Sequence, residues 1–230
     1  MLLTRIFHYI ALTSNKFTID ESHAILHSLN TLVHSSNMLR EEMVTKPFLK
    51  NQERVIHTAA LLHDMVDHKY VDNPENAMLR MRSYFRRDFS PNELEVIQKI
   101  ITTCSYTKVK KQGFPNLGEY QTAYHIVREA DILCSYDFDR AMTYMLYKNR
   151  DMSKIIPNGC TFETAYLNSC RFFNERVFTQ IDDQLFFIPY SQRLAPKLHE
   201  SAKERIWMWK YLYDLYQASG TTPPPTSGLF

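Results

Sequence analysis

The sequence contains little glycine, with 5 residues of this type among 230. All five fall in segments that interrupt the predicted helices, and none belongs to a Gly-rich phosphate-binding loop, which excludes a P-loop enzyme. The 4 cysteines form no close pair in the sequence. We therefore expect neither a zinc knuckle nor a redox dithiol, and reduced thiols in a cytoplasmic protein are the simple interpretation.

Long apolar runs and a large net charge are also absent. No apolar stretch reaches the length that a membrane helix needs, and Arg5 and His8 interrupt the first twelve residues, which favours a packing helix over a secretory signal. The formal net charge of +2 by itself predicts neither nucleic-acid binding nor its absence. We expect no membrane partner, and we regard a small molecule as a better candidate partner than nucleic acid.

What the sequence has in quantity is helix-forming and core-forming residues. Leu, Met, Lys, Arg and Glu occur in long runs, and hydrophobic residues make up 44% of the chain. At Ser90-Pro91-Asn92-Glu93, Ser90 predicts an N-cap and Glu93 the other half of a capping box. Asp72-Asn73-Pro74 predicts another helix start. Further helices are predicted at about residues 1–12, 20–43, 51–66, 119–148 (with a kink or break near 136–139), 161–179 and 198–216.

These elements predict an all-α protein in one domain. The domain is expected to cover residues 1–217, and the tail at 218–230, with its three consecutive prolines, is expected to be disordered. The segment at 51–66 is apolar almost all round, which predicts a buried central helix.

Four residues in the helical segments form a candidate ligand set for one divalent metal ion: His27, His63, Asp64 and Asp131. Imidazole and carboxylate groups bind borderline and hard cations, and four such ligands leave room for water and substrate. His63, Asp64 and Asp131 follow or lie among apolar residues, where an unpartnered polar group is costly. An alternative for the adjacent pair His63-Asp64 is a helix end that turns to solvent. His27 shares its helical face with other histidines, most of which are expected to be core or surface residues and not ligands.

The order of these residues resembles the ligand order of the HD-domain phosphohydrolase superfamily, His…His-Asp…Asp. The resemblance covers about residues 17–150. Residues 20–29 are similar to the opening motif of the family, in which the second histidine, here His27, is the ligand. Asn30-Thr31 differ from the Arg-Val pair that is common there. Residues 59–70 match the family doublet closely, and 128–131 resemble the closing motif.

The resemblance implies an HD-domain helical bundle with C-terminal helices at 160–217 outside the ligand-bearing core. Asp67 and Lys69 are similar to an HDxxDxK branch thought to hydrolyse nucleotides. It also implies roles for the remaining polar residues. Asp67, Lys69 and Asp64 would act in catalysis, and substrate would be bound by Lys69, Arg128, Lys108 and Tyr106. Simpler explanations stay open, since Lys108 could be a solvated helix end, Tyr106 a packing residue and Arg128 a partner of Asp131.

The implied activity is hydrolysis of a nucleotide or similar small phosphate ester by a metal-activated water. We expect one divalent ion, Mn²⁺ or Mg²⁺, with Fe, Ni, Co and Zn as alternatives. Members with two metals add histidines between the doublet and the last Asp, and here only His68 and His125 lie there, at spacings that point to other faces. A non-catalytic metal- or nucleotide-binding protein and a di-iron oxygenase are the competing functions, and a homodimer is an open alternative.

Overall fold

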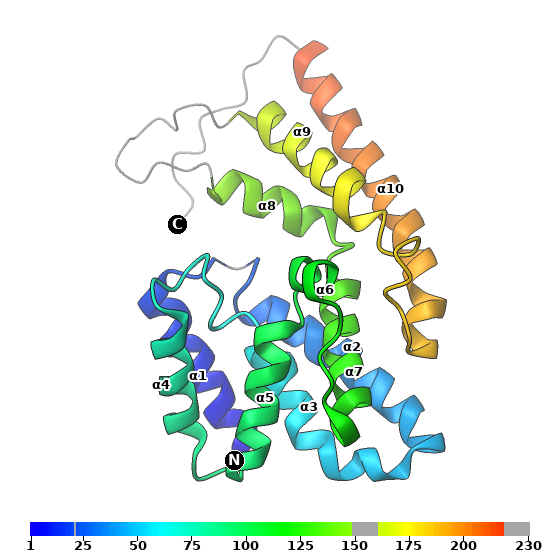
Figure 1. The fold of residues 1–230 in the computed structure, drawn as a ribbon. Helices are drawn as coiled ribbons and strands as arrows, with labels where there is room; N and C mark the ends of the chain where they lie inside the picture. The colour runs from blue at the N-terminus through cyan, green and yellow to red at the C-terminus, as the bar shows by residue number, and fades with distance from the viewer. Residues whose placement is uncertain (21, 149–160, 219–230) are drawn as a thin grey trace. The chain divides into compact units, whose positions relative to one another are not determined.

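The computed structural model describes residues 1–20, 22–148 and 161–218 (Figure 1). These residues form helices joined by turns and contain no strand, so the predicted all-α fold class is confirmed. The chain divides into two compact units, of which the first comprises residues 1–135 and 181–196 and the second comprises 136–180 and 197–230. The residues predicted for the disordered tail lie outside the described residues, except for Ala218 at the end of the last helix.

The first unit contains most of the helices. Their order is α1 (Leu2–Phe17), α2 (Ile25–Thr45), the 3-10 helix η1 (Pro47–Gln52), α3 (Glu53–Leu62), α4 (Pro74–Phe85), α5 (Pro91–Thr103), α6 (Tyr106–Gln112), the 3-10 helix η2 (Gly118–Tyr120) and α7 (Gln121–Cys134).

Helix α3 forms the centre of this unit. It contacts α1, α2, α5 and α7. Its apolar residues from Ala59 to Leu62 are fully buried, as expected for a helix that is apolar on nearly every side. Because α2 and α7 also contact each other, each of the three helices α2, α3 and α7, which carry the predicted ligands, contacts the other two.

Two predicted helix starts are confirmed by their caps. The Ser90 hydroxyl accepts a hydrogen bond from the Glu93 amide, and the Glu93 carboxylate accepts one from the Ser90 amide, which completes the capping box of α5. The Asn73 side chain caps α4, with Pro74 at its first position.

The predicted start of the second helix at Asp20 is wrong. The Asp20 carboxylate accepts hydrogen bonds from the amide and hydroxyl of Ser22, and the His23 amide donates to the Asp20 carbonyl. These contacts form a turn after Thr18, which has a left-handed backbone (φ 51°). Helix α2 therefore begins only at Ile25.

Other helix bounds differ in instructive ways. The segment predicted at 119–148 is broken after Cys134, as expected near 136–139, and resumes as α8 (Phe138–Lys148). The last helix, α10 (Pro189–Ala218), begins nine residues before its predicted start because it continues through Pro196. A proline inside a helix costs one backbone hydrogen bond, which is why the sequence favoured a start after it.

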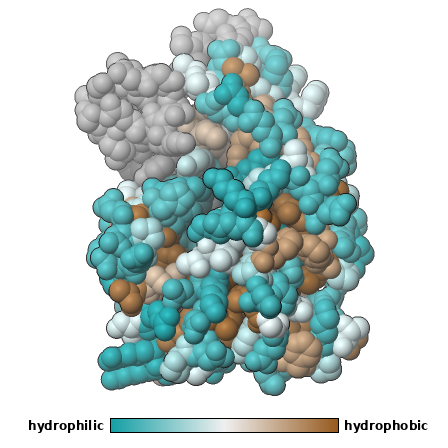
Figure 2. Space-filling model, in the orientation of Figure 1, coloured by the Kyte–Doolittle hydropathy of each residue, from teal (hydrophilic) through white to brown (hydrophobic). Residues whose placement is uncertain are grey.

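The second unit contains α8, α9 (Phe162–Phe172), a π-helical turn at Phe173–Val177 and the later part of α10. Asp139 pairs with Arg205 and accepts a hydrogen bond from the Trp209 indole. No helix within the described ranges has both the length and the apolar character of a membrane span. The face drawn in Figure 2 is mostly hydrophilic where it is coloured, with apolar residues in separate patches.

Candidate metal centre

The predicted ligands lie on or directly after three helices of the first unit that contact one another. His27 lies in the first turn of α2, His63 is the C-cap of α3 with Asp64 directly after it, and Asp131 lies in the second half of α7. His27, His63 and Asp131 form a group that could hold a metal ion.

The carboxylates of Asp64 and Asp131 each lie close to the Nε2 atoms of both histidines. The Nε2 atoms of His27 and His63 are 3.0 Å apart. Asp64 Oδ2 lies 3.2 Å from the first of these nitrogens and 3.4 Å from the second, and Asp131 Oδ1 lies 3.3 and 3.4 Å from them. Asp64 therefore contacts both histidines, whereas the donors that all lie within 4.8 Å of one another are those of His27, His63 and Asp131.

These separations fit ligands of a single ion. Two donors that each lie about 2.1 Å from one ion are about 3.0 Å apart in an octahedral and about 3.4 Å apart in a tetrahedral arrangement. The orientation of His63 agrees, because its Nδ1 lies 2.8 Å from the Ala60 carbonyl, which can only accept a hydrogen bond. Nδ1 therefore carries a proton, and the lone pair of a neutral ring is on Nε2, which faces the cluster.

The cluster is closed on its imidazole side and partly open on its carboxylate side. The side chains of His27 and His63 are 1% and 2% exposed, whereas those of Asp64 and Asp131 are 14% and 26% exposed. A site of this kind gives solvent or a small ligand access from one direction only.

The electrostatics of the cluster show how strongly these groups interact. Burial alone would lower the pKa of His63, but the facing carboxylates of Asp64 and Asp131 raise it well above its usual range. Burial would likewise raise the pKa of Asp64 and Asp131, and the histidines instead hold both well below the usual range. Both carboxylates are therefore ionised at neutral pH.

The other predicted site residues are not part of this donor cluster. Asp67 Oδ1 accepts a hydrogen bond from the Lys69 amide (2.9 Å) and pairs with His68, and Lys69 Nζ lies 3.6 Å from Asp67 Oδ2. The Lys108 ammonium donates to the Thr102 carbonyl at the end of α5. Tyr106 donates its hydroxyl proton to Asp183, which also pairs with Lys110.

Arg128 is fully buried and makes protein contacts. Its Nη2 donates to Glu129 Oε1 (2.8 Å) and to the Leu185 carbonyl (2.5 Å), and its guanidinium lies 5.0 Å from the Phe114 ring centre and 5.7 Å from that of Phe187. In the described residues its charge is thus met by Glu129 and not by Asp131.

Two features near the cluster were not predicted. The first is a buried network of Asp20, Ser22, His23 and Tyr70 in the turn before α2. The second is the buried thiol of Cys104, whose pKa burial raises to about 12, with a further contribution from the two carboxylates of the cluster. The closely spaced polar residues at 20–23 were the available sequence signal for the network.

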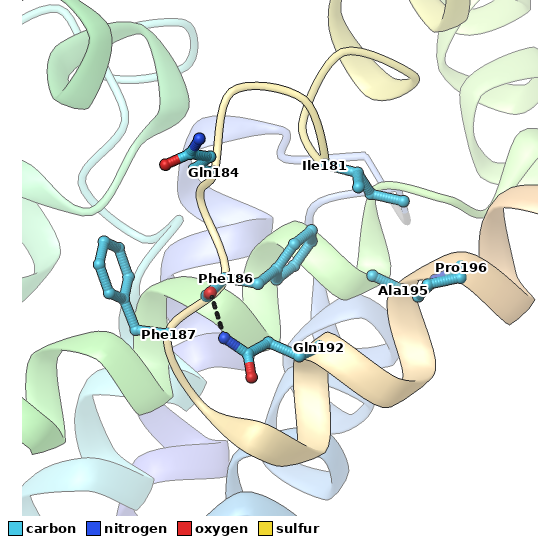
Figure 3. A pocket seen from close by; sticks show the side chains of 7 residues that line it. All are labelled: Ile181, Gln184, Phe186, Phe187, Gln192, Ala195 and Pro196. Carbon is cyan, nitrogen blue, oxygen red and sulfur yellow. Dashed lines mark hydrogen bonds between the residues drawn. The ribbon is translucent and has the colours of Figure 1, made fainter.

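The first unit also contains a separate cavity of about 460 Å³. It is lined by residues of the segment 181–196, including Phe186, Phe187 and Gln192, and the Gln192 amide donates to the Phe186 carbonyl (Figure 3). None of the four ligand residues lines it.

The fold and the site together define an all-α protein with a buried His/Asp cluster that could hold a metal ion. No protein-family model and no curated protein matches the sequence. The chain is similar in fold to the crystal structure of a protein from Lactobacillus plantarum, a Northeast Structural Genomics target, with a TM-score of 0.64 and 18% sequence identity over 93% of this chain and 97% of that chain. At this identity the likeness supports the fold and nothing more specific.

Proposed function

We propose that the chain is a metal-dependent phosphohydrolase of the HD superfamily that hydrolyses a nucleotide or similar small phosphate ester. The approach of Asp64 and Asp131 to within 3.2–3.4 Å of the His27 and His63 nitrogens, which lie 3.0 Å apart, carries this proposal. When both imidazoles are neutral, as metal ligands must be, the two ionised carboxylates leave a surplus of two negative charges in a largely buried place. A divalent cation neutralises that surplus.

The partial exposure of the carboxylate side supports a catalytic site over a purely structural one. Structural metal sites are closed by protein ligands, whereas catalytic sites keep a position for water and substrate. The mixed set of two nitrogen and two oxygen donors suits Mn²⁺, and Mg²⁺ is the natural alternative at cellular concentrations because it also accepts carboxylate ligands.

An ion bound here supplies a Lewis acid for a phosphate oxygen and lowers the pKa of a bound water. The protein supplies the remaining functions. His27 and His63 hold the ion, with His63 kept in one tautomer by the Ala60 carbonyl. Asp64 places one oxygen at the cluster and offers its carboxylate as an acceptor for a water. Asp67 takes up a proton, and Lys69, beside it, attracts the phosphate of the substrate.

Two described cysteines, Cys104 and Cys170, are free thiols. Free thiols fit a reducing compartment, and we therefore propose that the enzyme works in the cytoplasm on a small phosphorylated metabolite.

A panel of nucleotides tests this function. The full chain is incubated with nucleoside mono-, di- and triphosphates in the presence of Mn²⁺ or Mg²⁺, and phosphate and pyrophosphate release are measured. We expect metal-dependent release from at least part of the panel, and none from His63→Ala protein prepared in parallel. Stoichiometric metal and nucleotide binding without turnover would support the non-catalytic alternative, and two irons per chain would support an oxygenase.

A further inference from the structure

The turn before α2 holds a buried polar network around the carboxylate of Asp20. Ser22 and Tyr70 each donate a hydroxyl proton to this carboxylate, one to each oxygen. The Nδ1 atom of His23 lies 2.7 Å from the Ser22 hydroxyl oxygen and 2.9 Å from that of Tyr70. Asp20, Ser22 and His23 are at most 9% exposed.

The number of hydroxyl protons in this network determines the tautomer of His23. A hydroxyl group has a single proton, and those of Ser22 and Tyr70 are both given to Asp20, a carboxylate that can only accept. The two hydroxyl oxygens can therefore only accept from His23 Nδ1. The proton of the neutral ring is thus on Nδ1, and the lone pair is on Nε2.

His23 is also a neighbour of the metal centre. Its ring lies edge-on to that of His27 with the centroids 6.2 Å apart. His23 lies four residues before His27, in the turn that precedes α2, and it is not a member of the donor group.

We propose that His23 is a further catalytic residue, whose Nε2 accepts a hydrogen bond from the water that attacks the phosphate, with Asp20, Ser22 and Tyr70 as its positioning residues. This inference rests on the proposed function. It assigns the network a task beyond anchoring the turn, because the network fixes the lone pair of His23 on Nε2 in a ring that lies beside His27.

Two measurements test the placement without reference to turnover. Long-range ¹H–¹⁵N spectra of the Mg²⁺-loaded protein should show the proton of His23 on Nδ1, and Tyr70→Phe should shift the His23 signals. Tyr84→Phe is the matched control, because it also removes a tyrosine hydroxyl that contacts a histidine, His8, but on α4. A crystal structure of the Mn²⁺-loaded protein should place a water about 2.7–3.2 Å from His23 Nε2. A proton on Nε2, or a Mn²⁺-loaded site without that water, would overturn the inference.

Kinetics then test the catalytic role. His23→Gln and His23→Ala should keep the metal, lose about 10- to 100-fold in kcat and change KM little, with Gln retaining the larger share as a hydrogen-bonding replacement. Tyr70→Phe should lower kcat by a smaller factor, whereas Tyr84→Phe should not. Wild-type kcat in His23→Ala would overturn the inference and leave the hydrolase proposal standing. If no nucleotide is hydrolysed by wild type, the proposed function fails, and the spectra and the crystal structure alone decide on His23.

Discussion

Helix α7 carries two buried polar centres that balance their charges differently. At one, Arg128 and Glu129 pair at 2.8 Å, and both are fully buried. Glu129 also accepts hydrogen bonds from the Phe187 and Ile188 amides (2.9 and 3.0 Å) and from the Ser191 hydroxyl. At the other, Asp131 joins Asp64 and two histidines, and no described Lys or Arg pairs with these carboxylates.

The difference separates a structural centre from a binding centre. The positive and negative charges of Arg128 and Glu129 cancel, and their hydrogen bonds fasten the segment 185–191 to α7. The Asp131 centre has two carboxylates within 3.2–3.4 Å of the Nε2 atoms of two histidines, and it is partly open on the carboxylate side. Buried charge is stable only when it is paired or bound to a metal, so the first centre is complete in itself, whereas the second could hold a cation. The predictions below test each centre separately, together with the residues near the metal centre.

The largest effect is expected at the metal centre itself. His63→Ala or Asp64→Ala should abolish tight metal binding and all hydrolase activity, because each removes a donor from a four-residue set. Metal content is measured by elemental analysis after dialysis, and folding by circular dichroism. His57→Ala is the control, since His57 lies on the same helix but hydrogen-bonds Ser36. Full metal content in the His63 and Asp64 variants would refute the ligand assignment.

The second largest effect is expected to separate His27 from His23, the two histidines of the opening motif, by their metal content. His27→Ala should cost metal, because its Nε2 lies 3.0–3.3 Å from the other donors. His23→Ala should leave metal stoichiometry close to wild type, because His23 is held by Ser22 and Tyr70 instead. Equal metal loss in both variants would mean that the cluster is larger than four residues or that a second ion is bound.

Substitution of Asp67 tests whether this residue accepts a proton during hydrolysis. Asp67→Asn keeps the oxygen that accepts from the Lys69 amide but removes the ability to take up a proton. Turnover should fall by about two to four decades, the usual range for general acid–base catalysis, with metal content unchanged. Lys69→Met should weaken substrate binding as well, which appears as a higher KM. Wild-type turnover in metal-loaded Asp67→Asn would eliminate Asp67 as the base.

The meeting of His27, His63 and Asp131 was predictable in part because polar residues among apolar ones are expensive to bury. His63 and Asp64 follow a fully buried apolar run, and Asp131 lies among buried residues of α7, so their polar character stood out against an apolar pattern. The central position of α3 and the caps of α4 and α5 followed from equally local rules. In each case the local pattern and the tertiary environment favour the same structure.

What could not be predicted depends on partners distant in sequence. The turn at Asp20 is completed by Tyr70, 50 residues later, and the environment of Arg128 is made by the carbonyl of Leu185. The start of α10 before Pro196 is held by Ser191, which donates to Glu129. These contacts pair residues whose side chains, considered alone, fit a surface position equally well, so no periodicity reveals them.

Breaking the Arg128–Glu129 pair should lower the free energy of unfolding and leave metal binding unchanged. Arg128→Met leaves the Glu129 charge buried without its partner, and losing one member of a buried pair typically costs about 3–5 kcal/mol. Urea unfolding monitored by circular dichroism measures the loss, and metal content should stay at the wild-type level. A stable variant with raised KM would instead support the predicted substrate-binding role of Arg128.

The smallest effect is expected for Lys108, which the sequence offered both as a phosphate ligand and as a solvated helix end. Its ammonium donates to the Thr102 carbonyl at the C-terminal end of α5, where a cation also interacts favourably with the helix dipole. Lys108 is exposed, so Lys108→Met should change the free energy of unfolding by no more than about 0.5 kcal/mol, as is usual for surface sites. KM for the best substrate should then be unchanged, because the ammonium is engaged at the helix end. Lys110→Met, which removes a neighbouring cation paired with Asp183, controls for the change in net charge. A KM that rises severalfold in Lys108→Met, but not in Lys110→Met, would show that Lys108 leaves the helix end to bind the phosphate, and would extend the substrate site from the metal cluster to the start of α6.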